Sequence, residues 1–186
     1  MLFSHSDNPT DIWLSIKHEL HRGALEPKHP FRYVNLATIG KDFPQVRTVV
    51  LREVTQEFDF LVFTDYRTSK VKEIQQSPAV SLHFYHPKKM LQIRVEAEAE
   101  IHFQNELSDR YWKQIPENRK GEYTGAFTPG QVIENPELGW KISGQSFFTV
   151  IKMRPSRIEA LQIAKKGHLK IQFESQNNWQ GQWLAP

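Results

Sequence analysis

Alternating apolar and polar residues predict that most of the chain forms β-strands. The clearest run is LQIRVEAEAEI, where every second residue from Leu91 to Ile101 is apolar. A period of two places the apolar side chains on one face of a strand and the polar ones on the other. This pattern predicts a strand over residues 90–103. Shorter runs predict further strands at residues 34–39, 45–52, 58–63, 79–84, 147–153, 157–163, 169–174 and 179–184.

Helical spacing of apolar residues occurs in fewer places. Asn8 is a favourable N-cap and Pro9 suits the first helical position, so a helix is expected over about residues 8–23. A second helix is expected at about 106–115, where Pro116 follows. The next segment, about 117–145, is rich in Gly, Pro, Asn and aromatic residues, and a loop of this length is usually functional.

The order of these elements indicates the fold class. Eight or nine strands follow one another in hairpin order, and two or three helices flank them. Residues 175–178 read as the turn of a C-terminal hairpin. The sequence contains no repeat and no domain boundary. We therefore expect one domain over residues 1–186, mainly β with peripheral helices, built as an antiparallel β-barrel.

Composition narrows the chemistry. The 186 residues include no cysteine, which excludes disulfides, thiolate metal sites and thiol nucleophiles. No metal site is expected, because His18 and His21 are three residues apart but lack an evident third ligand. The N-terminus lacks the pattern of a signal peptide, and no apolar run approaches the roughly 20 residues of a membrane span, so a cytoplasmic protein is expected.

The net charge and the absent motifs limit the classes of ligand and of enzyme to be considered. A net charge of +3 and a pI of about 9.1 suit anionic ligands such as phosphates, and also weak contact with nucleic acid. The sequence has no Gly-x-Gly-x-x-Gly, phosphate-binding loop, His-Glu-x-x-His or Gly-x-Ser-x-Gly motif. A dinucleotide-binding fold, a nucleotidase and a zinc peptidase are therefore unsupported.

Two basic clusters form the main candidate site. In VFTDYRTSKVKEI, residues 62–74, a predicted strand runs into hydroxyl and charged residues before a short helix. Arg67 and Lys70 lie here, and Arg47 and Arg52 lie at the two ends of an earlier strand. A helix N-terminus, hydroxyls and arginines suit a phosphate monoester. A capped, solvated loop remains the alternative, and the spacing of Arg47 and Arg52 directs them to opposite strand faces.

Several stretches together resemble the FMN-binding core of the pyridoxamine 5'-phosphate oxidase family. They are RTVVLR (47–52), FTDYRTSKVKEIQQSPAVSLHFYHP (63–87) and LQIRVEAEAE (91–100), followed by RIEALQI and the C-terminal WQGQWLAP. The resemblance covers about residues 30–186. It implies a split β-barrel that forms a homodimer, binds FMN at the subunit interface and acts as an oxidoreductase.

The resemblance also implies which residues contact FMN. Arg47 and Lys70 would hold its phosphate, Gln92 would bond to the flavin ring, and Gln131 would come from the partner subunit. Ser69 stands where the oxidases usually have Arg, and Arg67 lies two residues earlier, so Arg67, Ser69 or both are candidates to replace that arginine. The expected FMN contacts are Arg47, Thr48, Val49, Val50, Leu51, Arg52, Phe63, Thr64, Arg67, Ser69, Lys70, Gln92, Gln131 and Lys170.

The substrate side departs further from the family pattern. Ile115 replaces a family Arg and Leu161 replaces a Trp, while Arg119 is a candidate to compensate. A pyridoxamine or pyridoxine phosphate substrate would give up hydride from C4' to flavin N5, and oxygen would reoxidise the flavin. Catalysis would be mostly orientation, so no catalytic side chain is assigned. The expected substrate contacts are Arg52, Tyr111, Arg119, Lys166 and His168.

Two alternatives accompany this interpretation. A different flavin reductase or an FMN carrier on the same fold is the first, and the substrate-side departures motivate it. A nucleic-acid-binding β-barrel is the remote second, prompted by the pI and the aromatic residues. It is disfavoured because the basic residues cluster at loop ends and are not spread along a strand face between aromatic residues.

Overall fold

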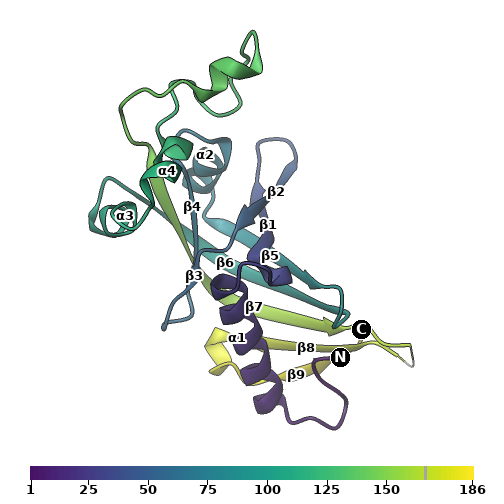
Figure 1. Ribbon diagram of the computed structural model, residues 1–186. Coiled ribbons are helices and arrows are strands. Elements are labelled where there is room, and N and C mark those ends of the chain that lie inside the picture. Colours follow the sequence, from purple (N-terminus) through teal and green to yellow (C-terminus); the bar gives the residue numbers. More distant parts are fainter. Residues whose placement is uncertain (166) are drawn as a thin grey trace.

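The computed structural model describes residues 1–165 and 167–186, and within them one curled antiparallel sheet dominates (Figure 1). The strand order is β2-β1-β5-β6-β7-β4-β3, and β8 and β9 continue from β7. The expected mainly β fold with peripheral helices is confirmed. The strands are β1 (Tyr33–Ile39), β2 (Pro44–Val50), β3 (Glu53–Val54), β4 (Phe60–Asp65), β5 (Ala79–His86), β6 (Leu91–Phe103), β7 (Phe148–Gln162), β8 (Leu169–Glu174) and β9 (Gln182–Leu184).

Helices flank the sheet at different ends (Figure 1). Helix α1 (Pro9–Leu25) begins where predicted, with the Asn8 side chain accepting a 2.8 Å hydrogen bond from the Thr10 N–H. The predicted loop over 117–145 contains more structure than expected, because short helical turns interrupt it. The other helical elements are α2 (Ser69–Gln76), α3 (Glu106–Trp112), α4 (Glu117–Lys120) and 3-10 turns at Pro30–Arg32, Gly121–Tyr123, Pro136–Trp140 and Ser175–Asn177.

The core lies between α1 and the concave sheet. Ile12, Ile16 and Leu20 recur at helical spacing on α1 and are fully buried. On β6, alternate residues from Leu91 to Ala99 are buried in the same core, as the period of two predicts. Each buried Leu or Ile side chain contributes about 1.5–3 kcal/mol. This packing fixes which residues of each strand face inward and which face outward.

A second, smaller apolar cluster lies beneath α3, and we call it the α3 cluster. It contains Leu61, Tyr111, Tyr123, Phe148 and Val150, with Phe63 and Ile115 among the partly buried residues packed against it. Strands β4 and β7 form the sheet side of this cluster, because Leu61 belongs to β4 and Val150 belongs to β7. The α3 cluster therefore joins the helical segment after residue 105 to the sheet.

One sequence prediction about strands is wrong. The predicted strands 147–153 and 157–163 are one strand, β7. Ala97 pairs with Pro155 and Glu96 with Arg157, so Ser156 is the extra residue of a bulge that accommodates a proline inside the sheet. The strand predicted at 45–52 corresponds to β2, which ends at Val50 and pairs with β1. The predicted C-terminal hairpin is confirmed, with β8 paired to β9.

Among the described residues, no helix is both long and apolar enough to cross a membrane.

Candidate functional site

A partly buried lysine, Lys70, marks the junction between β4 and α2. The Lys70 ammonium lies 3.0 Å from the Thr64 hydroxyl, which lies 3.4 Å from the hydroxyl of Thr68. Burial lowers the pKa of Lys70, and the nearby Arg47 lowers it further. We call Arg47, Thr64, Thr68 and Lys70 the α2 corner. An ammonium that is removed from water and bonded to a neutral hydroxyl is suited to receive an anion.

The start of α2 adds unpaired donors to this corner. Thr68 occupies the N-cap position, but its side chain does not cap the helix. Its hydroxyl donates instead to the Asp65 carbonyl at 2.8 Å. The first N–H groups of a helix lack partners within the helix, and they lie at the positive end of its dipole. An anion at this corner would therefore meet backbone donors as well as Lys70.

Arg47 reaches the corner from the inner face of β2. It pairs with the buried Leu36 of β1, which places its side chain on the core side of the sheet. Its guanidinium lies 2.7 Å from the Glu73 carboxylate and also contacts the Thr38 hydroxyl. Arg47 is therefore close to α2 but already holds one carboxylate, whereas Lys70 does not.

Arg67 makes a different set of contacts from Lys70. Its guanidinium pairs with the Asp65 carboxylate at 2.7 and 3.0 Å and donates to the Gly125 carbonyl at 2.9 Å. It also stacks over the Phe147 ring, 3.5 Å from the ring centre. These contacts fasten the segment after α4 to the end of β4. Ser69, the other candidate for this role, lies exposed at the first position of α2.

Of the remaining predicted cofactor residues, Thr48, Gln92 and Lys170 lie on the outer face of the sheet. Leu51 is instead fully buried in the core, Val49 packs against the core, and Phe63 packs against the α3 cluster. Gln92 on β6, Leu161 on β7 and Lys170 on β8 are neighbours in the strand register, which forms a row across three strands. The Lys170 ammonium lies 3.3 Å from Glu159. Thr48 is exposed on β2, two strands beyond β5, through its pairing with Asn35. This open row and the α2 corner are separate surfaces of the single chain.

The chain changes partner strands immediately after β2. The N–H of Leu51 donates to the Arg32 carbonyl and the N–H of Arg52 donates to the Leu61 carbonyl, both at 2.9 Å. The Arg52 guanidinium then lies 5.5 Å from the centre of the Phe63 ring. Its Nε is buried without a hydrogen-bond partner. Such an unpaired donor is costly, and a ligand acceptor would satisfy it.

Tyr111 lies beside this arginine but is already bonded. Its hydroxyl donates to the Glu53 carboxylate at 2.7 Å and accepts from Arg110 at 3.0 Å. Its ring lies 5.2 Å from the Phe63 ring. Burial raises the pKa of Tyr111, and the hydrogen bond to Glu53 raises it further. Sequence reasoning missed Glu53, because its role depends on a contact between β3 and α3.

The other predicted substrate residues fall into two groups. Arg119 is exposed on α4 but lies near Arg52, since the charges of both oppose the burial that raises the pKa of Tyr123, and Ile115 packs in the α3 cluster. His168 is exposed and its Nδ1 accepts from the Ala164 N–H at 3.3 Å, while Lys166 lies outside the described residues. Gln131, the residue expected to serve a partner subunit, is exposed at a cavity of about 270 Å³ that Arg67 also lines.

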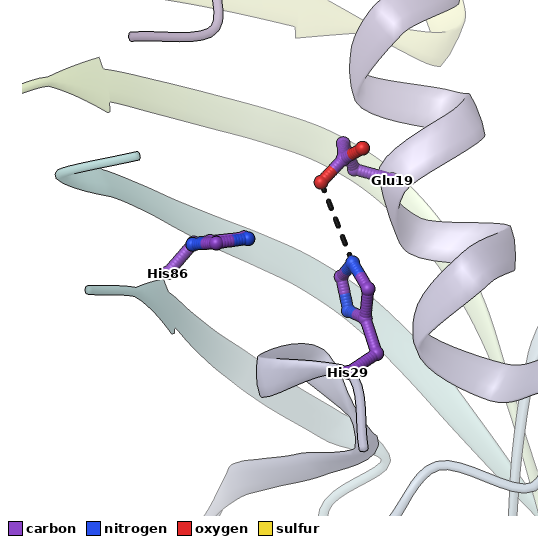
Figure 2. A group of neighbouring side chains, drawn as sticks. All are labelled: Glu19, His29 and His86. Carbon is purple, nitrogen blue, oxygen red and sulfur yellow. Dashed lines mark ion pairs between the residues drawn. The ribbon is translucent and has the colours of Figure 1, made fainter. Parts of the chain in front are cut away.

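A buried group that sequence reasoning did not find lies at the other end of the sheet. Glu19, His29 and His86 approach one another from α1, the Pro30–Arg32 turn and β5 (Figure 2). The candidate ligand atoms lie within 4.8 Å of one another, and the His29 ring nitrogen Nε2 is 3.4 Å from the Glu19 carboxylate. Glu19 occupies the buried stripe of α1, so helical periodicity could have singled it out.

The hydrogen bonds of this group favour a structural role over a metal site. The Nδ1 atoms of His29 and His86 accept from the backbone N–H groups of Phe31 and Lys89 at 3.1 and 3.2 Å. Neutral rings bonded in this way carry their proton on Nε2, where a metal would need a lone pair, and metal-bound histidines normally donate through the other nitrogen. Lys89 also lies 2.7 Å from the Glu19 carboxylate.

Comparison with known proteins agrees with this geometry. Residues 11–103 match the family described as pyridoxamine 5'-phosphate oxidase, FMN-binding domain. The chain is 32% identical over 194 residues to a pyridoxine/pyridoxamine 5'-phosphate oxidase of Leptospira biflexa serovar Patoc, covering 94% of this chain and 86% of that protein.

Two solved structures share the fold. One is a pyridoxamine 5'-phosphate oxidase-related, FMN-binding protein from Nostoc punctiforme, with a TM-score of 0.76, 20% identity and coverage of 92% of this chain and 96% of that one. The other is PhzG from Burkholderia lata, in complex with tetrahydrophenazine-1-carboxylic acid, with a TM-score of 0.73, 16% identity and coverage of 100% and 98%. These structures confirm the split-barrel fold.

Proposed function

The chain belongs to the pyridoxamine 5'-phosphate oxidase family, and on that premise we propose that it is an FMN-dependent oxidoreductase acting on a small molecule. The observation that carries the proposal is Lys70, a partly buried ammonium whose hydrogen-bond partner is a neutral hydroxyl. Family members share this FMN-binding domain, and a phosphate monoester fits the donors around Lys70.

The α2 corner would hold the FMN phosphate. Lys70 and the first N–H groups of α2 would donate to its oxygens, and Thr64 would hold the ammonium in place. Arg47 would add a charged donor beside its bond to Glu73. When bound, FMN would supply the redox chemistry by accepting hydride from the substrate. The protein would supply binding and orientation.

In a homodimer, the row of Gln92, Leu161 and Lys170 on the outer face of the sheet, which we call the outer row, would contact the flavin ring. Gln92 and Lys170 face an open surface in the single chain, so a second chain would be needed to enclose a ligand there. Apolar side chains lie exposed on this same face of the sheet. Tyr33 and Ile39 of β1 and Val46 of β2 are 65%, 54% and 65% exposed. Exposed apolar patches of this kind favour an interface.

Cofactor content and stoichiometry test this proposal. The purified protein is expected to be yellow, to release FMN on denaturation, and to elute at the size of a dimer. Protein that is colourless and takes up no added FMN would overturn the proposal. A yellow monomer would overturn only the part that concerns the homodimer.

A different flavin reductase, or an FMN carrier, is the second candidate. Ile115 favours it, because this residue packs in the α3 cluster where the oxidase pattern has an arginine. Leu161 lies on the outer row next to Gln92, where the oxidase pattern has a tryptophan. Turnover of pyridoxine 5'-phosphate to pyridoxal 5'-phosphate with release of hydrogen peroxide would eliminate this candidate.

A further inference from the structure

We propose that an arm of each protomer lies in a hollow on the outer face of its partner's sheet. The arm is the segment of residues 121–145, which follows α4 and precedes β7 (Figure 1). A second copy of this chain therefore fills the hollow, and in a two-fold symmetric dimer the contact occurs twice. This contact rests on the homodimer of the proposed function, and it identifies two surfaces that would meet in that dimer.

The arm exposes apolar side chains that its own chain leaves uncovered. Val132, Trp140 and Ile142 are 93%, 85% and 66% exposed, and the first two are more exposed than any other large apolar residue that the structure describes. The arm extends beyond the end of the sheet, away from α1 (Figure 1). Large apolar side chains that gather on one exposed segment are typical of an interaction site.

Backbone hydrogen bonds pair the two ends of the arm. The Ala126 N–H donates to the Lys141 carbonyl at 2.7 Å, and Gly125 pairs with Ile142 in a single β-bridge. Lys141 is itself exposed between Trp140 and Ile142. The arm therefore presents an ordered apolar, basic and apolar sequence to a partner, and an ordered segment loses less conformational freedom on binding.

Small side chains form the hollow on the outer face of β1, β5 and β6. It has a volume of about 470 Å³, and Ala37, Ala79 and Ser81 line it together with Ile39 at its edge. Ala37 pairs with Ser81 in the strand register, so the two lie side by side. A hollow within the roughly 300–1,000 Å³ of small-molecule pockets is large enough for an indole ring. No described residue of the arm lines the hollow of its own chain.

The charges of the hollow suit Lys141 of the arm. Glu96 and Glu98 line one side and are exposed, and neither makes an ion pair with another described residue. The lining includes no lysine or arginine, and the two arginines opposite on β7 pair with other carboxylates of the chain. A lysine between two apolar side chains therefore fits an apolar hollow that has two free carboxylates on one side.

The acidic residues of the arm also have a candidate partner on this face. Glu134 and Glu137 lie nearer the tip of the arm than Lys141. Arg154 is opposite Glu98 in the strand register, and its side chain is 75% exposed. Opposite charges at two places along the contact would fix the direction of the arm across the partner's sheet.

Engineered cysteines test this contact directly, because the sequence contains no cysteine of its own. One copy of the chain carries Gly139→Cys, beside Trp140, and a second copy with a different affinity tag carries Ser81→Cys, in the hollow. The two copies are produced together in one cell, so that mixed dimers form, and are treated with a short bismaleimide cross-linker. The control pair has His18→Cys, an exposed position on α1, in place of Ser81→Cys.

A cross-linked product that carries both tags is expected from Gly139→Cys with Ser81→Cys, at a yield at least tenfold above that of the control pair. The position on α1 lies on the opposite side of the sheet, so it should remain out of reach of the arm. Equal yields from the two pairs, or no product from either, would overturn the proposal.

Charge reversal gives a second, independent measurement. Lys141→Glu and Glu98→Lys are each expected to raise the dissociation constant of the dimer at least tenfold, as measured by sedimentation equilibrium, and the double variant is expected to recover most of this loss. Lys113→Glu, at an exposed position after α3, is the control. An unchanged constant in both single variants, or a double variant that is no tighter than either, would overturn the proposal.

Flavin content and size are measured on every sample, which separates the arm contact from the proposed function. A monomeric wild type would overturn the arm contact and the homodimer together. A yellow dimer that gives no mixed cross-link would overturn the arm contact alone. Colourless protein that still gives the mixed cross-link would support the arm contact and count against FMN binding.

Discussion

Two charged clusters of this protein, one around Glu19 and one at the α2 corner, differ in how completely their charges are paired. Glu19 is surrounded by Lys89 and Arg22, at 2.7 and 2.9 Å, with His29 beside them. Lys70 at the α2 corner bonds to the neutral Thr64. The first is centred on a buried carboxylate that contacts its countercharges directly, whereas the partly buried ammonium of the second contacts a neutral hydroxyl, with the Glu73 and Asp65 carboxylates farther away. A cluster that is paired internally stabilises the fold, and one that lacks an anion is prepared for a ligand.

The largest effect is expected on stability, from a change in the group of Glu19, His29, His86, Lys89 and Arg22, which we call the Glu19 cluster. Glu19→Gln removes the carboxylate and leaves Lys89 without its partner. We expect a loss of about 3–5 kcal/mol in the free energy of unfolding, measured by urea denaturation. FMN affinity of the folded fraction is expected to stay unchanged. Glu26→Gln, which alters the exposed second partner of Arg22, is the control and is expected to shift the urea midpoint far less. Equal shifts would contradict the assignment.

Lys70→Met is expected to weaken FMN binding and to leave the stability of the fold nearly unchanged. It keeps the apolar stem, so the fold is retained. It removes the charge, so FMN binding is expected to weaken roughly 10- to 100-fold, in line with charge-assisted hydrogen bonds. Titration of the apoprotein with FMN, followed by flavin fluorescence, measures this. Lys72→Met on the exposed side of the same helix is the control. Weakening of the same size in both variants would show that general charge and not the α2 corner binds FMN.

Lowering the pH is expected to reduce the folding stability of the protein through the two buried histidines of the Glu19 cluster. Burial lowers the pKa of His29 and of His86 below the ordinary value. The unfolded chain therefore binds more protons, and stability is present above the ordinary histidine pKa of about 6.5 and is lost as pH falls below it. Urea midpoints at pH 7.5 and 5.5 measure this loss. His29→Asn, which keeps an N-cap acceptor for Phe31, is expected to reduce it, and an unaltered pH dependence would exclude His29 as its source.

The smallest effect is expected at Arg67. Its guanidinium is engaged by Asp65, Gly125 and Phe147. Arg67→Ala is therefore expected to change FMN affinity less than about threefold, because a guanidinium already bonded to Asp65 and Gly125 is not free to donate to the phosphate. Limited proteolysis should instead become faster near residue 125. A loss of FMN affinity above tenfold would return Arg67 to the phosphate site as the displaced arginine.

The sequence was informative where the signal is local. Strict alternation located β6, and Asn8 with Pro9 located the start of α1. These features depend on residues within one or two turns, so periodicity and capping rules reach them. The sequence could also predict the α2 corner, because Thr64 and Lys70 are six residues apart in the chain and meet across a single turn.

Long-range contacts were beyond the sequence. The Glu19 group joins residues 19, 29 and 86 from separate elements, and Glu53 meets Tyr111 only because β3 pairs with β4 beneath α3. The runs 147–153 and 157–163 were predicted as separate strands, and the structure joins them into β7 through a bulge at Ser156. Partner choice among strands depends on the topology of the whole sheet, so the pairing of β2 with β1 also required the structure.

The central place of β7 has a consequence for synthesis of the protein. Strand β4, which carries Thr64, pairs only with β3 and β7 among the described strands. Its partner β7 begins at Phe148, far along the chain. At roughly 5–20 residues per second on the ribosome, the N–H and C=O groups on the β7-facing edge of β4 lack their partners for several seconds. The nascent chain therefore exposes an unpaired, aggregation-prone strand edge until the last fifth of the protein is synthesised, and chaperones are expected to bind during that interval.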